Sequence, residues 1–340
     1  TPACTQIRLR QRPDGPPRLD DFEVAAVDVA DPAPGEVRLE TLWLSLDPYM
    51  RGRMNDGPSY ARPVGLGEVM TGEGIARVEA SAADGLAVGT LVRAPVGWQT
   101  HAVLPADQVT ALPELGVPPQ THLGVLGMPG LTAYAGLLEL GRPEAGETLV
   151  VAAATGPVGS LVGQLAERRG VRTVGIAGGA QKVGWLGDVF GFDVALDHRA
   201  EGFADALARA CPDGVDIYVE LVGGHVLAAV RPLLNTHARI PVIGTVAHYN
   251  AAVPPEGPDR LPGFMRDVLV RRLAVQGMIV WDYAHLRARF LAEVAPLVRA
   301  GEIRYIEDVV DGLDAAPAAF IGMLDGRNRG KLLVRVAADA

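Results

Sequence analysis

The chain has 340 residues, of which 49% are hydrophobic and 21% charged, a composition typical of a globular protein long enough for two domains. Its formal net charge of −9 argues against nucleic acid or an anionic lipid surface as a partner. Its only cysteines are Cys4 and Cys211, and its seven histidines are scattered, so neither a disulfide framework nor a metal site is expected.

Short β-type runs separated by Gly- and Pro-rich turns fill residues 1–120 and predict a compact, mostly β domain. The clearest is 36–44 (EVRLETLWL), in which the side chains alternate in character, and similar runs follow at 74–80 and 90–94. Between them, residues 45–54 (SLDPYMRGRM) are expected to form an irregular connecting loop, which could also line a site.

Residues 148–163 (TLVVAAATGPVGSLVG) carry the most specific pattern in the chain. An apolar strand runs into Ala154-x-Gly156-x-x-Gly159, and helical spacing follows. Strand, glycine turn and helix is the arrangement that binds a dinucleotide pyrophosphate, although Ala154 replaces the usual first glycine. A structural glycine turn is the alternative. Residues 148–166 carry no charge, but Gly156, Pro157 and Gly159 would interrupt a membrane helix, so no membrane segment is expected.

From about Gly127 onward, strands and helices are predicted to alternate, which indicates a doubly wound parallel sheet with helices on both faces. A helix is expected at 130–140, and a last strand at 331–336 is expected to return to the first domain. The predicted strands of the sheet are 149–153, 173–177, 194–196, 217–221, 239–242 and 273–280, with helices such as 206–210, 226–234 and 286–300.

The end of the second strand of this series favours NADP(H) over NAD. NAD-binding folds usually place an acidic residue there for the ribose hydroxyls, whereas a basic residue accommodates the 2′-phosphate of NADP. Residues 176–182 (IAGGAQK) contain no acid and end in Lys182. The alternative is that Lys182 is an ordinary solvated lysine at the start of a helix.

Several motifs in the same order resemble the zinc-free branch of the medium-chain dehydrogenase/reductase superfamily. Within it, the similarity is to the leukotriene B4 dehydrogenase/prostaglandin reductases, curcumin reductases and 2-alkenal (double-bond) reductases. The motifs are 47–54 (DPYMRGRM), 127–134 (GMPGLTAY), 154–164, 235–240 (NTHARI), Tyr249-Asn250 and 328–331 (NRGK).

The resemblance implies an α/β protein in which a GroES-like catalytic domain, 1–123 completed by 303–340, carries an inserted Rossmann domain at 124–302. It implies NADPH as cofactor and reduction of the C=C bond of α,β-unsaturated aldehydes and ketones, with hydride delivered to the β-carbon. It also implies a homodimer. The absence of a basic, then apolar, N-terminal segment predicts no signal peptide and a cytoplasmic location.

The family's cofactor contacts map onto the pyrophosphate turn, the 2′-phosphate region, the segment 243–249, the nicotinamide region and the tail. His198 stands where relatives have a tyrosine, so His198 or Arg199 is expected either to contact the adenosine phosphate or to have a plain surface role. Leu221 replaces a relative's asparagine, and that contact is not carried over. The cofactor residues are Ala154, Thr155, Gly156, Pro157, Val158, Gly159, Gly178, Lys182, His198, Gly244, Tyr249, Met278, Ile279, Val280 and Asn328.

Without a metal, hydrogen-bond donors must stabilise the enolate that forms during reduction. The candidates are the nicotinamide ribose 2′-hydroxyl and Tyr249, which would either hold that hydroxyl or pass on a proton. Tyr49 is the second choice, and water is the alternative source of the α-carbon proton. The expected substrate pocket contains Tyr49, Met50, Arg51, Tyr60, Met128 and Tyr249. Quinone reduction on the same scaffold and a non-catalytic NADPH-binding role remain alternatives, whereas a zinc alcohol dehydrogenase is disfavoured because the expected ligands are missing.

Overall fold

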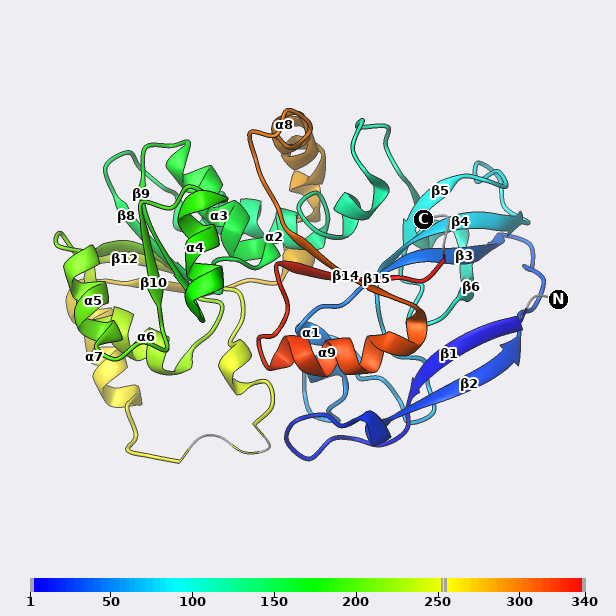
Figure 1. Cartoon of the computed structure of the whole chain (residues 1–340), viewed down its shortest axis with the longest axis horizontal. Coiled ribbons are helices and arrows are strands. Elements are labelled where there is room, and N and C mark those ends of the chain that lie inside the picture. The colour runs from blue at the N-terminus through cyan, green and yellow to red at the C-terminus, as the bar shows by residue number, and fades with distance from the viewer. Residues whose placement is uncertain (1–2, 252, 254–255, 338–340) are drawn as a thin grey trace. The chain divides into compact units, whose positions relative to one another are not determined.

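The computed structural model describes residues 3–251, 253 and 256–337. The chain divides into two compact units (Figure 1). The first comprises Thr1–Gly124, Tyr249–Ala252 and Glu307–Ala340, and the second comprises Val125–His248 and Val253–Ile306. Each unit is built around its own sheet.

The first unit is mostly β. Strands β1 (Ala3–Leu9) and β2 (Phe22–Asp28) pair antiparallel, and a larger sheet has the order β14-β15-β3-β4-β5-β7, with β6 beside β3. Its strands are β3 (Glu36–Ser45), β4 (Gly74–Ser81), β5 (Leu91–Ala94), β6 (His101–Pro105), β7 (Thr110–Ala111), β14 (Glu307–Asp311) and β15 (Lys331–Arg335). Because β15 pairs antiparallel with β3, the end of the chain completes a sheet begun near its start.

An aromatic cluster lies in the core of the first unit. Phe22 stacks on Trp98 with ring centroids 5.6 Å apart, and Phe320 meets Trp98 edge-on at 5.5 Å. Phe320 comes from α9 (Ala316–Leu324), and all three rings are buried with alternate residues of β3 such as Val37 and Leu39. The period-two pattern of β3 therefore faces a real core.

The segment 45–54, expected to be an irregular loop, contains a short helix, α1 (Tyr49–Arg53). Pro48 precedes it with φ −59°, a value that proline imposes and that suits a helix start. Beside it, Lys331 Nζ donates to Asp47 Oδ1 at 2.7 Å and to the Leu46 carbonyl at 2.9 Å, and both charged side chains are buried. The loop expectation was wrong because this buried contact orders the segment.

The second unit confirms the predicted α/β fold with a parallel sheet. Its six strands have the order β10-β9-β8-β11-β12-β13, and every neighbouring pair is parallel. The reversal of strand order on either side of β8 is typical of doubly wound sheets. The strands are β8 (Thr148–Ala152), β9 (Arg172–Ala177), β10 (Val194–Asp197), β11 (Val215–Val219), β12 (Leu234–Val242) and β13 (Ala274–Gly277).

Helices cover both faces of this sheet (Figure 1). Val150 and Ala152 of β8 pack in one core cluster with residues of α5 and α6, whereas the alternate residues Leu149 and Val151 point to the opposite face. The helices are α2 (Met128–Ala135), α3 (Pro157–Glu167), α4 (Ala180–Asp188), α5 (Phe203–Ala210), α6 (Gly224–Val230), α7 (Leu261–Arg271) and α8 (Arg287–Arg299). The helix expected at 130–140 is α2 followed by a π-helical turn, Gly136–Gly141.

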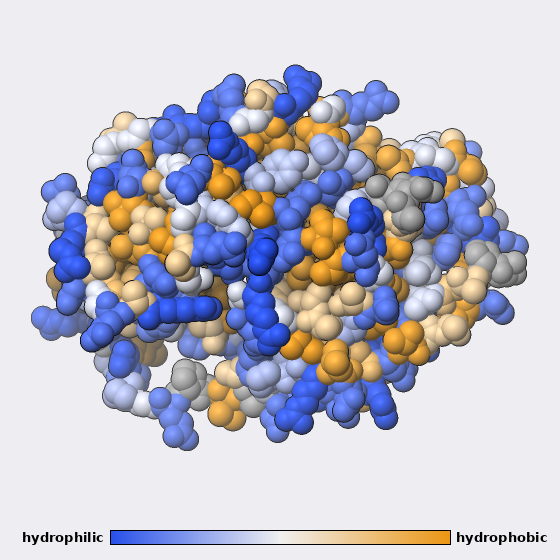
Figure 2. All heavy atoms as spheres, viewed as in Figure 1, coloured by the Kyte–Doolittle hydropathy of each residue, from blue (hydrophilic) through white to orange (hydrophobic). Residues whose placement is uncertain are grey.

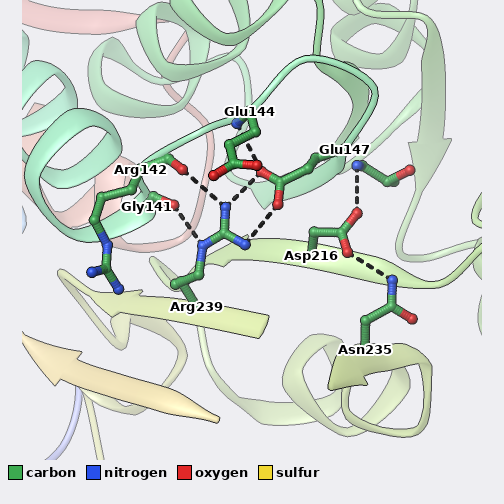
Figure 3. Close-up of polar contacts among 8 residues, drawn as sticks. Gly141, Arg142, Glu144, Glu147, Asp216, Asn235 and Arg239 are labelled. Carbon is green, nitrogen blue, oxygen red and sulfur yellow. Dashed lines mark hydrogen bonds and ion pairs between the residues drawn. The ribbon is translucent and has the colours of Figure 1, made fainter. Parts of the chain in front are cut away.

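A polar network ties the amino ends of the central strands together (Figure 3). The guanidinium of Arg239 donates to both carboxylate oxygens of Glu147, at 2.7 and 2.6 Å, and to the carbonyls of Gly141 and Arg142. Asn235 donates to Asp216, whose other oxygen accepts the Thr148 N–H. Asn235 and Arg239 of the NTHARI segment are thus structural, because they join β12 to β11 and to the residues around the start of β8.

Hydrophilic residues are spread over much of the face seen in Figure 2, with hydrophobic patches between them. Among the described residues, no helix is both long and apolar enough to span a bilayer.

Candidate cofactor site

The turn between β8 and α3 has an unusual backbone. Ala153, directly after the strand, adopts φ +49°, a left-handed conformation that is uncommon for alanine. The Gly156 N–H donates back to the Ala153 carbonyl at 2.9 Å, and Ala154 is fully buried with its N–H on the Ile176 carbonyl. The left-handed residue is therefore Ala153. The next residue, Ala154, is the position where the sequence pattern lacks its first glycine.

Gly159 allows the helix to approach this turn closely. A Cβ at Gly159 would lie 2.7 Å from the Ala153 carbonyl oxygen and 2.8 Å from Ala154 Cα. One helical turn later, a Cβ at Gly163 would lie 2.2 Å from the ring of Phe192. Both glycines are needed because backbone or a buried ring occupies the space of a side chain.

The first turn of α3 is suited to an anion. Gly156 is the N-cap residue and Pro157 the first helical residue, and no side chain caps the helix. The first N–H groups of a helix have no intrahelical acceptor and lie at the positive end of its dipole. Together with the close glycine approach, this turn fits the pyrophosphate of a dinucleotide.

A basic cluster lies at the carboxyl ends of β9 and β10. A Cβ at Gly178 would lie 2.9 Å from both His198 Nε2 and Arg199 Nε. Burial lowers the pKa of His198, and the charges of His225, Arg199 and Lys182 lower it further. These groups suit a phosphate, and sequence reasoning missed His225, which lies 27 residues from His198 and meets it only in the fold.

Glu220 organises the neighbouring turn and was also missed. Its Oε1 accepts the Tyr218 hydroxyl at 3.0 Å and the N–H groups of Val222 and Gly223 at 2.8 and 2.7 Å, and the side chain is buried. Its carbonyl accepts the N–H groups of Ile243 and Gly244. The one signal in the sequence was an acid at the end of an apolar strand.

The segment that follows β12 is held against this turn along its length. The Val246 and Ala247 N–H groups donate to the carbonyls of Leu221 and Val222, at 3.2 and 3.0 Å. Leu221 therefore contributes here through its backbone, which does not require an asparagine side chain. Met278 N–H donates to the Val242 carbonyl at 3.0 Å, so the predicted residues Met278, Ile279 and Val280 start next to the end of β12.

The predicted pocket residues of the first unit have different environments. Tyr49 is half-buried, and burial raises its pKa well above the ordinary value, with the Asp47 charge adding to the effect. Met50 is fully buried in the core, and the buried Arg51 donates to the Gly15 carbonyl and to Asn55. The Arg53 guanidinium lies over the exposed ring of Tyr60.

Two further predicted residues complete the survey of the site. Asn328 belongs to the first unit and donates its side-chain amide to the Gly330 carbonyl at 2.8 Å. Met128 opens α2 in the second unit and is half-buried. Among the described residues, no group of three or more histidine, cysteine or acidic side chains is arranged to hold a metal ion.

Fold and turn together define a dinucleotide-dependent oxidoreductase built from a β domain and a parallel α/β domain. Residues 5–112 match the family described as the N-terminal domain of oxidoreductase, and residues 190–334 match the zinc-binding dehydrogenase family. The chain belongs to the medium-chain dehydrogenase/reductase family, in the group that contains the curcumin, 2-alkenal and prostaglandin reductases.

Individual relatives match almost end to end. The chain is 51% identical to the NADPH-dependent curcumin reductase of Escherichia coli, covering 97% of this chain and 96% of the relative. It is 39% identical to the NADP(+)-dependent 2-alkenal reductase of Nicotiana tabacum, covering 98% of each. The crystal structure of CurA from Vibrio vulnificus in complex with NADPH superposes with a TM-score of 0.95 at 48% identity, covering 98% of this chain and 99% of CurA.

The close approach at Gly159 gives a direct test of the turn. We expect Gly159→Ala to destabilise the protein by about 1–3 kcal/mol and to weaken NADPH binding, because the new Cβ would collide with backbone that cannot move independently. Gly187→Ala in α4 is the matched control: a Cβ there meets nothing within 4 Å, so a neutral or slightly stabilising effect is expected. Thermal unfolding and NADPH titration of both variants test this prediction. Equal stability and equal NADPH affinity of the two variants would contradict the close packing at Gly159.

Proposed function

We propose that the protein reduces the C=C bond of α,β-unsaturated aldehydes and ketones, using NADPH. The observation that carries the proposal is the similarity to the curcumin reductase, at 51% identity, and to the 2-alkenal reductase, at 39% identity, in both cases over almost the whole chain. The chain is an NADPH-dependent oxidoreductase, and the substrate class is the proposed part.

The residues of the second unit fit NADPH at two places. The uncapped start of α3, closely packed through Gly159, would hold the pyrophosphate. The basic groups Lys182, His198 and Arg199 would hold the 2′-phosphate, with Gly178 leaving room for them. When bound, NADPH supplies the hydride.

The protein's own contribution to the reaction is hydrogen bonding to the substrate carbonyl. We assign this role first to Tyr249, which follows the segment held by the Glu220 turn, and second to Tyr49. A tyrosine with a pKa near 10 or above stays protonated at neutral pH and therefore donates a hydrogen bond rather than acting as a base. The raised pKa of Tyr49 strengthens that argument for its hydroxyl.

We also propose that the protein forms a homodimer through β13. This strand lies at the end of the six-stranded sheet, and all four of its residues are exposed. An open strand edge is a template for pairing with a second copy. Leu269 and Val270, at the end of the preceding helix α7, are 77% and 56% exposed and would be covered in such an assembly.

The activity test supplies NADPH with a medium-chain 2-alkenal and, separately, a simple quinone, followed by mass spectrometry of the products. We expect a saturated carbonyl product and a kcat/KM at least ~10-fold lower with NADH, which lacks the phosphate that the basic cluster would bind. Turnover of the quinone alone would replace the proposal with quinone reduction. NADPH binding without turnover of either acceptor would favour a non-catalytic role.

Tyr249→Phe tests the assigned donor. We expect kcat to fall by about 10²-fold, a larger effect than that on NADPH affinity, because one donor at the developing oxyanion is lost. Tyr49→Phe, measured in parallel, should have the smaller effect. If Tyr49→Phe alone lowered kcat, the two roles would be exchanged, and if neither did, water would be the remaining donor.

Light scattering tests the dimer. We expect the wild type to have twice the mass of the chain and Val275→Lys to shift it toward monomer, because a charge on the edge strand opposes strand pairing. Val24→Lys is the matched control, since Val24 is an exposed strand valine of the first unit. A monomeric wild type, or dissociation by both variants, would contradict the β13 interface.

A further inference from the structure

Two histidines outside the glycine turn form a hydrogen-bonded pair. His198 Nδ1 lies 3.1 Å from His225 Nε2, their ring centroids are 5.1 Å apart, and His225 Nε2 is also 3.2 Å from the His198 carbonyl. His198 follows β10, and His225 lies at the start of α6. His198 is half-buried and His225 is exposed, so a ligand in solvent can reach the pair.

The groups around the pair disfavour protonation of His198 on balance, but one of them is negative and favours it. Arg199 beside it and Lys182 on α4 are positive, and with burial and His225 they lower the pKa of His198. The negative group is Asp197, whose carboxylate accepts the backbone N–H groups of Arg199 and Gly179. Since two imidazolium rings would face each other with donors only, the pair at neutral pH shares a single hydrogen between its facing nitrogens.

The pair lies where the adenosine phosphate is expected. His198 Nε2 and Arg199 Nε both lie 2.9 Å from the position that a Cβ of Gly178 would occupy, just after the second strand of the sheet. In doubly wound folds this is the place where the adenosine ribose hydroxyls, or the 2′-phosphate, are recognised. A phosphate dianion here would meet an imidazole nitrogen that can gain a proton.

With NADPH as the cofactor, and resting on the 2′-phosphate site given under the proposed function, we propose that the His198–His225 pair recognises the 2′-phosphate by taking up a proton when the cofactor binds. A proton from solvent forms a new N–H bond on the pair, and the resulting imidazolium donates to the phosphate. No other bond forms or breaks. His225 is thereby a specificity-determining residue that acts by sharing the charge of His198.

The sign of the pH dependence follows from this linkage. The bound phosphate raises the pKa of His198 above its lowered value in the free protein, so NADPH affinity increases as pH falls through the pKa of His198 in the complex. The gain disappears at higher pH, where the bound pair is neutral. Below its own second pKa of about 6, the phosphate loses one negative charge, which sets the acid limit of this window. NADH, without the phosphate, should bind with little dependence on pH.

Calorimetry of NADPH binding in two buffers of different ionisation enthalpy measures the proton directly. We expect net proton uptake with NADPH near neutral pH and none with NADH. His225→Gln keeps a hydrogen-bonding partner for His198 but cannot titrate. It should reduce the uptake and weaken NADPH about tenfold at slightly acidic pH, without changing NADH affinity.

His237→Asn is the matched control, because it removes an exposed histidine of β12 at φ +66°, a conformation that asparagine tolerates. It should behave as the wild type. Tight, selective NADPH binding without proton uptake, or uptake unchanged in His225→Gln, would overturn this inference and leave the proposed function standing. Failure to distinguish NADPH from NADH at all would overturn the proposed 2′-phosphate site as well.

Discussion

The first unit depends on a buried ion pair that joins positions 284 residues apart. Lys331 and Asp47 are each at most 5% exposed, and the lysine also donates to the Leu46 carbonyl. Losing either partner would leave a buried charge uncompensated, a cost of about 3–5 kcal/mol. Because the chain of the second unit separates β3 from β15, this contact and the strand pairing beside it are what complete the first sheet. They also hold the segment that carries Tyr49.

In the sheet of the second unit, the backbone groups at the two ends of the strands find their hydrogen-bond partners differently. At the amino ends, side chains satisfy the backbone: Arg239 reaches two carbonyls and Glu147, and Asp216 accepts the Thr148 N–H. At the carboxyl ends, α3 starts without a side-chain cap, and Ala153 holds a strained conformation. The backbone donors that suit a ligand are thus left at the carboxyl end of β8, the end of the strands at which ligands bind in parallel α/β folds.

Periodicity predicted the buried elements well because strands such as β9 and β12 face an actual core. The strand expected at 239–242 is the end of β12, and that at 173–177 is nearly all of β9. Boundaries failed where tertiary contacts decide: β11 ends at Val219 because the Glu220 carboxylate binds the next turn. The helix after Pro48 has only that proline as a local signal, and the meeting of His198 with His225 has none, since each depends on residues distant in sequence.

The glycine at position 178 links two features of the chain, the missing acid after the second strand and the basic groups His198 and Arg199. The sequence indicated NADP(H) because no acid ends the second strand, which by itself is only an absence. In the structure, a side chain at Gly178 would lie 2.9 Å from His198 and Arg199, so an acidic side chain and the basic cluster compete for the same space. A carboxylate there would pair with these groups and repel a phosphate. A glycine at position 178 therefore both lacks the acid that favours NAD and would let His198 and Arg199 meet the extra phosphate in the proposed site.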